Sequence, residues 1–199
     1  MKNQIREPQQ ERSIEKKNKI IQAGYELFSE VGYHGTNTVE IAKRAGVSTG
    51  IVYGYFQDKR DIMISVLQIY IDNVYTPVLD IMKSVNAPLD IEHMVPQIID
   101  KTIAMHEQNA KLHNTLHSLA TTDETVNAKF IALEDNITEN ISALLKQNGV
   151  NLPSIKERVH LAMNIVQSFA HEYVFDNHPY IDYQAMRKTV CTTIVNLFK

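Results

Sequence analysis

Apolar residues recur every three or four positions along most of the chain, which is the spacing of helices that bury one face. No segment shows the sustained alternation of apolar and polar residues that is typical of strands. The pattern therefore predicts an all-α protein of about nine helices. The longer helices are expected over residues 14–31, 101–119, 126–147, 155–175 and 182–198.

Prolines and one acidic residue indicate where the middle helices begin and end. Asp58 is suited to cap a fourth helix, which should end or bend near Pro77. Pro88 fits the first turn of a fifth helix, because its missing N–H needs no partner there. Pro96 follows in the same segment and is expected to bend or split that helix.

Two later helix starts carry the capping-box spacing, in which a hydroxyl residue precedes a glutamate by three positions. The pairs are Thr121 with Glu124 and Ser154 with Glu157. Gly149 is expected to end the helix between them, since glycine readily takes the left-handed conformation found after a helix C-terminus. Asp182 is expected to start the last helix.

Residues 36–61 contain two short helical patterns joined by Ala45, Gly46 and Val47. Asn37 or Thr38 can cap the first helix and Ser48 the second, and Gly46 supplies the positive φ that a tight turn requires. The apolar residues are spaced to pack the two helices against each other at a steep angle: Ile41, Ala42, Val47, Ile51 and Val52. The segment therefore predicts a helix-turn-helix, whose second helix enters the major groove of DNA.

The residues around this motif resemble the TetR (tetracycline-repressor-like) family of bacterial regulators. The resemblance rests on Gly32-Tyr33-x-Gly35-Thr36-x-Thr38-Val39-x-Ile41-Ala42, on Ala45-Gly46-Val47-Ser48-x-Gly50 and on Tyr53-x-Tyr55-Phe56-x-x-Lys59. It covers residues 20–62, and beyond them only length and helical character agree. It implies a DNA-binding domain at residues 1–60 with a short N-terminal arm, and a helical ligand-sensing and dimerisation domain at residues 61–199.

The resemblance also implies which residues contact DNA. The first turn after Ser48 should face the base edges, where Thr49 can hydrogen-bond a base and Ile51 offers apolar contact. Tyr53 and Tyr55 match an aromatic pair of the family, whose phenols can donate to phosphate, and Tyr53 could also contact a base or sugar. Lys59 matches a phosphate-binding lysine of the family. The expected DNA-contacting residues are Thr36, Thr38, Lys43, Ser48, Thr49, Gly50, Ile51, Tyr53, Tyr55 and Lys59.

Two features bear on how many contacts the motif can make with DNA. Gly54 departs from the family, whose members often carry a bulkier residue there, so one contact is expected to be absent. Basic residues before the first helix could form an arm in the minor groove, although a solvated tail fits them better: Lys2, Arg6, Arg12 and Lys16. Phe56, Ile41, Ala42, Val47 and Val52 are expected in the core.

Charge is distributed unevenly along the 199 residues, whose formal net charge is −3. Residues 1–60 hold ten Lys or Arg and seven Asp or Glu, a charge of +3, which leaves −6 on the remainder. A basic reading domain on an acidic body suits a DNA-binding protein, although chance explains the asymmetry equally well without the motif.

The composition also bears on localisation. Cys191 is the single cysteine, no apolar run approaches the ~18 residues that span a bilayer, and residues 1–13 are polar. We therefore expect a cytoplasmic protein without a signal peptide.

The last two helices have apolar faces that could pair with those of a second copy, giving a homodimer through a four-helix bundle. A purely intramolecular core fits the same residues nearly as well.

In the family, the helices that follow the fourth helix enclose a cavity that holds a small-molecule effector. The residues expected to line it here, many of which could equally be plain core, are Tyr70, Val74, Met94, Ile98, Met105, His106, His117, Phe130, Leu133, Met163, Gln167 and His171.

The residues suggest no other chemistry. His113 and His117 share a helix face and His106 lies two turns earlier, but a zinc or copper site needs further ligands, so no metal site is expected. No phosphate loop, nucleophile elbow or carboxylate pair is present, so neither a cofactor nor enzymatic activity is expected.

The predicted function is that of a transcriptional regulator, most commonly a repressor, which a small molecule releases from a palindromic operator. A DNA-binding regulator without such a ligand, a metal-responsive repressor and a helix-turn-helix protein that binds another protein are the alternatives.

Overall fold

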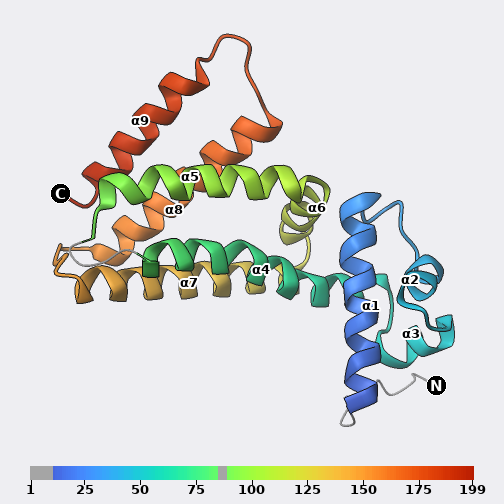
Figure 1. Cartoon of the computed structure of the whole chain (residues 1–199). Coiled ribbons are helices and arrows are strands. Elements are labelled where there is room, and N and C mark those ends of the chain that lie inside the picture. Colours follow the sequence, from blue (N-terminus) through green and yellow to red (C-terminus); the bar gives the residue numbers. More distant parts are fainter. Residues whose placement is uncertain (1–10, 85–88) are drawn as a thin grey trace. The chain divides into compact units, whose positions relative to one another are not determined.

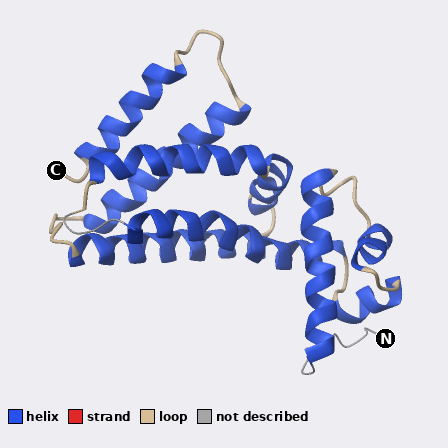
Figure 2. Ribbon diagram, in the orientation of Figure 1, coloured by secondary structure: helices blue, strands red, loops and turns tan. Residues whose placement is uncertain are grey.

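The computed structural model describes residues 11–84 and 89–199, and these residues form nine helices and no strand (Figures 1 and 2). The all-α prediction is confirmed. No helix in the described ranges is long and apolar enough to cross a membrane. The helices are α1 Glu11–Glu30, α2 Thr38–Ala45, α3 Thr49–Tyr55, α4 Lys59–Ser84, α5 Ile91–Gln108, α6 Ala110–Ala120, α7 Glu124–Gln147, α8 Ile155–Phe175 and α9 Tyr183–Asn196.

Acidic residues cap several of these helices. Asp58 accepts the N–H of Asp61 at the start of α4, and Asp182 accepts those of Gln184 and Ala185 at the start of α9, as predicted. At α5 the same role falls to Asp90, which accepts the N–H of His93. The proposed start at Pro88 lies outside the described residues. A carboxylate in the first turn also suits the positive end of the helix dipole.

The two predicted capping boxes are wrong. Asp123 caps α7 by accepting the N–H groups of Thr125 and Val126, at 3.0 and 3.2 Å. The hydroxyl of Thr121 instead donates to the carbonyl of Ser118 at the end of α6. Ser154 does precede α8, but at φ 54° and ψ 40° its side chain makes no capping hydrogen bond.

The helix end predicted near Pro77 and the split predicted at Pro96 are also wrong, whereas a bend at either proline stays a prediction. α4 continues through Pro77 to Ser84, and α5 contains Pro96 without a break. The break occurs at Asn109, which divides the single helix expected over residues 101–119 into α5 and α6. Asn109 has φ −117° and ψ 23°, and its side-chain oxygen accepts the hydroxyl proton of Tyr25 at 2.8 Å. That bond favours a non-helical asparagine, because its side chain is engaged away from the helix.

The helices form two compact units. Unit 1 comprises residues 1–72 and 109–128, and unit 2 comprises residues 73–108 and 129–199. The domain boundary expected at residue 60 lies just after α3 and stays a prediction.

Unit 1 is built on the crossing of α1 and the first half of α4. At Gly24 of α1 an added Cβ would lie 2.8 Å from Cγ2 of Ile62, so any larger residue would force the Ile62 side chain to shift. The largest fully buried side chains around the crossing come from all four N-terminal helices: Ile20, Phe28, Ile41, Val52, Phe56, Ile62, Met63, Val66 and Leu67. Four helices therefore share one core, which holds the short α2 and α3 in place.

α6 is fastened to α1 and α4 within unit 1. Besides the bond from Tyr25 to Asn109, Lys111 donates to the last carbonyl of α1, that of Glu30. The hydroxyl of Tyr70 on α4 lies 2.6 Å from Nδ1 of His113, and both side chains are buried. These polar contacts fix α6 on helices that also support α2 and α3.

Unit 2 packs α5, α8 and α9 around one apolar cluster, and Figure 1 shows α5 running beside α8. Its buried members are Val95, Ile99, Ala162, Val166, Phe169, Val190, Ile194 and Val195. A second, smaller cluster joins the end of α7 to the start of α8 through Leu145, Ile155 and Val159. Gly149, at φ 86°, ends α7 as predicted.

Candidate nucleic-acid interface

α2 is a short helix that is capped at both ends by residues next to it in the sequence. The side chain of Asn37 accepts the N–H groups of Val39 and Glu40, each at 3.0 Å, and Glu40 accepts that of Asn37 at 3.1 Å. The capping residue is therefore Asn37 rather than Thr38. Gly46 follows the helix at φ 68° and ψ 33°, the left-handed conformation predicted for this turn. With its caps in place, α2 fixes the direction in which the chain enters α3.

α3 lies on the core by one face and is uncovered on the other. Val52 and Phe56 are buried, and Ser48 caps the helix by accepting the N–H of Ile51 at 3.4 Å. A Cβ added at Gly50 would meet only the Ser48 hydroxyl, at 3.9 Å, and one at Gly54 would meet nothing within 4 Å. Because no side chain projects at Gly50 and Gly54, the backbone of this outer face can approach the edge of a base pair closely.

Two hydroxyl pairs lie beside this face. The hydroxyl of Tyr53 lies 3.0 Å from that of Thr38, and the hydroxyl of Tyr55 lies 2.7 Å from that of Ser13 on α1. Tyr53 is 45% exposed. In such a pair one hydroxyl donates to the other, so the second retains a proton for an outside acceptor such as a phosphate oxygen. Both pairs also fix the phenol rings before any ligand arrives.

Two of the residues expected at DNA have polar atoms that are engaged by the chain's own backbone. Thr36 is 2% exposed, and its hydroxyl donates to the carbonyl of Gly32 at 2.9 Å. The amine of Lys59 donates to the carbonyls of Tyr33 and Thr36, at 2.6 and 2.8 Å, and lies 4.2 Å from the centre of the Tyr33 ring. Burial lowers the pKa of Lys59. These positions tie the start of α4 to the turn between α1 and α2.

The other basic residues of the motif differ in how far they are neutralised. Arg44 bridges Glu26 and Glu30 of α1, at 3.3 and 2.9 Å. Arg60 pairs with Asp123 at 2.5 Å. Lys43 is exposed and forms no ion pair with any described residue, so its charge is available to a phosphate. Of the expected core residues, Ile41, Ala42, Val52 and Phe56 are buried and Val47 is half-buried.

The residues expected to bind a small molecule are divided between the two units. Tyr70 and His117 belong to unit 1, and the side chain of Val74 lies outside the described residues. In unit 2, Met94, Met105, His106 and Phe130 are buried, whereas Ile98, Leu133, Met163, Gln167 and His171 are half-buried. Ile98 packs against the apolar cluster of α5, α8 and α9, which is a plain core role. For the others, a part in ligand binding stays a prediction.

One cavity that sequence reasoning missed lies within unit 2, among α5, α8 and α9. It has a volume of about 430 Å³ and is lined by Asp100, Ile103, Ala104, Glu107, Tyr173, Gln184 and Arg187. Two of these lining residues are paired, because Arg187 donates two hydrogen bonds to Asp100, at 2.7 and 2.8 Å. No local signal could have found it, because its wall combines one face each of three helices that are distant in the sequence.

Comparison with known proteins agrees with this geometry. Residues 20–66 match the model of the family described as bacterial regulatory proteins, tetR family. Over 135 residues, 68% of its length, the chain is 27% identical to the HTH-type transcriptional regulator YuxN of Bacillus subtilis. That match spans 46% of YuxN, and matches to two further curated regulators span 25% and 32% of those proteins. The chain thus covers less than half the length of each.

Solved structures share this all-helical fold. A tetR-family regulator of Mesorhizobium loti superposes with a TM-score of 0.76 over 94% of this chain and 97% of its own, at 19% identity. FadR of Bacillus subtilis, solved with stearoyl-CoA, gives a TM-score of 0.64 over 92% and 99%, at 21% identity. At these identities the likeness shows a common fold.

Proposed function

Because the chain belongs, through its N-terminal domain, to the tetR family of bacterial regulatory proteins, we propose that it is a transcriptional regulator that binds a palindromic operator as a homodimer. The observation that carries the proposal is the uncovered outer face of α3, held on a capped and closely packed support. Thr49, Gly50 and Ile51 form its first turn and would read the base edges, while hydroxyls and a lysine beside them would contact phosphates.

The proposed contact set is smaller than the one expected from sequence. It retains Thr38, Lys43, Ser48, Thr49, Gly50, Ile51, Tyr53 and Tyr55. It leaves out Thr36 and Lys59, because their polar atoms are engaged inside unit 1. A single domain with so few phosphate contacts binds weakly, and this supports two copies on a symmetric site, with half-sites about 34 Å apart.

We further propose that the protein represses transcription and that a small molecule releases it from DNA. FadR of Bacillus subtilis, which shares the fold, binds stearoyl-CoA. α4 begins in unit 1 and ends in unit 2, so it is a continuous element that can connect effector and operator. The effector must bind the DNA-incompetent form more tightly, and the operator must then weaken effector binding by the same factor.

The test of the proposal is the affinity of the full chain for a palindromic fragment from upstream of its own gene, measured by fluorescence anisotropy at several salt concentrations. We expect the palindrome to bind at least ~10³-fold more tightly than a scrambled fragment, which is the lower end for specific regulators. Thr49→Ala should change the preferred bases and leave the affinity for scrambled DNA unchanged. Equal affinity for both fragments would contradict the proposal.

A further inference from the structure

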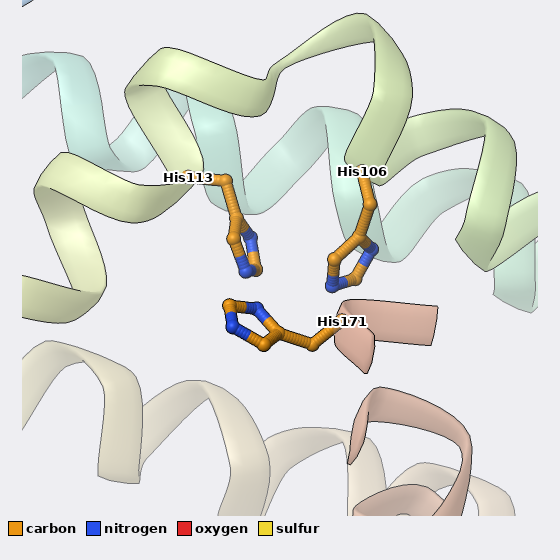
Figure 3. A group of neighbouring side chains, drawn as sticks. All are labelled: His106, His113 and His171. Carbon is orange, nitrogen blue, oxygen red and sulfur yellow. The ribbon is translucent and has the colours of Figure 1, made fainter. Parts of the chain in front are cut away.

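Two histidines of unit 2, one near the end of α5 and one near the end of α8, lie side by side. Ring nitrogens of His106 and His171 are within 4.8 Å of each other (Figure 3). The ring centre of Phe175 lies 6.3 Å from that of His106 and 4.9 Å from that of His171, so it forms an apolar wall beside both. The third histidine drawn in Figure 3, His113, belongs to unit 1 and bonds there with Tyr70.

The ring of His106 is prepared to act as a ligand. The residue is 4% exposed, and its Nδ1 lies 2.8 Å from the carbonyl oxygen of Thr102. A carbonyl oxygen can only accept, so Nδ1 carries the proton and Nε2 carries the lone pair. Burial, and to a smaller degree the neighbouring His171, lower the pKa of His106.

His171 has a matching arrangement on α8. Its Nε2 lies 3.4 Å from a carboxylate oxygen of Asp176, the residue that follows the helix. Histidines that bind metals commonly donate their second ring N–H to a carboxylate or a backbone carbonyl, which sets the tautomer and orients the ring. Thr102 and Asp176 supply one partner of each kind. The side chain of His171 is 42% exposed, so water can reach it.

We propose that His106 and His171 form a site for a divalent transition-metal ion of the zinc, cobalt or nickel class. The ion would be held by Nε2 of His106 and Nδ1 of His171, with water in its remaining positions. Imidazole ligands favour these metals over Mg²⁺ and Ca²⁺, which prefer oxygen. At metal–nitrogen distances of about 2.0–2.1 Å two tetrahedral ligands are roughly 3.4 Å apart, so the nitrogens need to approach by at most about 1.4 Å. The half-exposed ring of His171 can make that adjustment.

Occupation of the site would link α5 to α8, which already share the apolar cluster of unit 2. Because the unfolded chain holds the two rings far apart, the ion would bind the folded form preferentially and stabilise it. The inference does not depend on the proposed function, since it concerns metal binding by the chain without DNA.

Metal titration of the chelator-treated full chain tests the inference. We expect Co²⁺ to give the visible absorption of a nitrogen-coordinated ion, Zn²⁺ to compete for the site and raise the unfolding temperature, and Mg²⁺ to do neither. His106→Ala and His171→Ala should each weaken Co²⁺ binding by at least ~10-fold, since even loss of an outer partner costs 10–100-fold. His178→Ala, at an exposed histidine between α8 and α9, is the matched control and should bind as the unmodified chain does.

His171 is half-exposed, so its variant should fold even if loss of the buried His106 does not permit folding. Circular dichroism of each variant without metal distinguishes a folding defect from the removal of a ligand. Affinities unchanged by His171→Ala would overturn the inference. So would a titration weakened by His113→Ala and by neither of the two variants.

Discussion

At the scale of single residues, the basic side chains of unit 1 divide into those that hold the fold and those that face solvent. Arg44 and Arg60 are paired with carboxylates, and the amine of Lys59 is enclosed by the carbonyls of Tyr33 and Thr36. Lys43 remains exposed on α2. Exposed ion pairs contribute at most about 1 kcal/mol, whereas hydrogen bonds to a charged group contribute about 1.5–3 kcal/mol. The enclosed lysine is therefore the one on which stability depends.

Substitution of Lys59 should separate a structural lysine from a DNA contact. We expect Lys59→Ala to lower the free energy of unfolding by about 2 kcal/mol, because the turn between α1 and α2 loses its charged donor. Operator affinity should fall for every sequence, with an unchanged dependence on salt concentration. Lys43→Ala should do the opposite, leaving stability unchanged and reducing the salt slope by about one unit for each phosphate that Lys43 neutralises.

Urea denaturation and anisotropy at four salt concentrations measure both effects. A reduced salt slope for Lys59→Ala would return this residue to the interface, as the family resemblance implies.

At the scale of elements, the stability of α2 and α3 depends more on the residues that cap these helices than on intrinsic helix propensity. α2 has eight residues and α3 has seven, both too short to be stable in isolation. Two glycines weaken α3 further. Its stability comes from the Ser48 cap and from Val52 and Phe56 in the core, whereas α2 relies on Asn37 and Gly46.

Loss of the α2 cap should therefore affect the whole motif. We expect Asn37→Ala to cost about 1 kcal/mol of stability, because the N–H groups of Val39 and Glu40 lose their acceptor. Asn37→Asp retains an acceptor and is the control that should stay near the stability of the unmodified chain. Thermal unfolding followed by circular dichroism gives both values, and equal losses in the two variants would show that the cap is not the cause.

At the scale of the whole molecule, the proposed homodimer needs an apolar surface that the monomer leaves uncovered. Leu161 of α8 is 49% exposed, while the other face of the helix is buried in the cluster with α5 and α9. Large apolar residues are common on surfaces, so exposure alone decides little. Its place on the helix proposed for dimerisation makes it the position to test.

Leu161→Glu should weaken self-association, because a charge would be buried without a partner. We expect sedimentation velocity to show a dimer for the unmodified chain at micromolar concentration and mainly monomer for the variant. The affinity of the variant for the palindrome should fall with its dimerisation. Ile131→Glu, on α7 at 50% exposure, is the matched control and should remain dimeric. A monomeric unmodified chain with full operator affinity would exclude the homodimer.

The sequence alone determined the helix-turn-helix and the capping and core residues that stabilise it. The helix-turn-helix depends on caps, on a glycine with positive φ and on apolar residues three or four positions apart, all of which act within one turn of helix. Gly46, Ser48 and Val52 could be identified for that reason, and each has its expected role in the structure. Asn37 was one of two candidate caps, and the structure selects it over Thr38.

Only the tertiary structure decided the features that depend on partners far along the chain. Asn109 interrupts a helix where Tyr25, 84 residues away, bonds to it. Lys59 turns inward because carbonyls of an earlier turn lie within reach of its amine. His106 and His171 become neighbours only when α5 packs against α8. Local spacing carries no information on such contacts, because they are set by which helix faces pack together, so sequence patterns predicted the elements and packing decided these side chains.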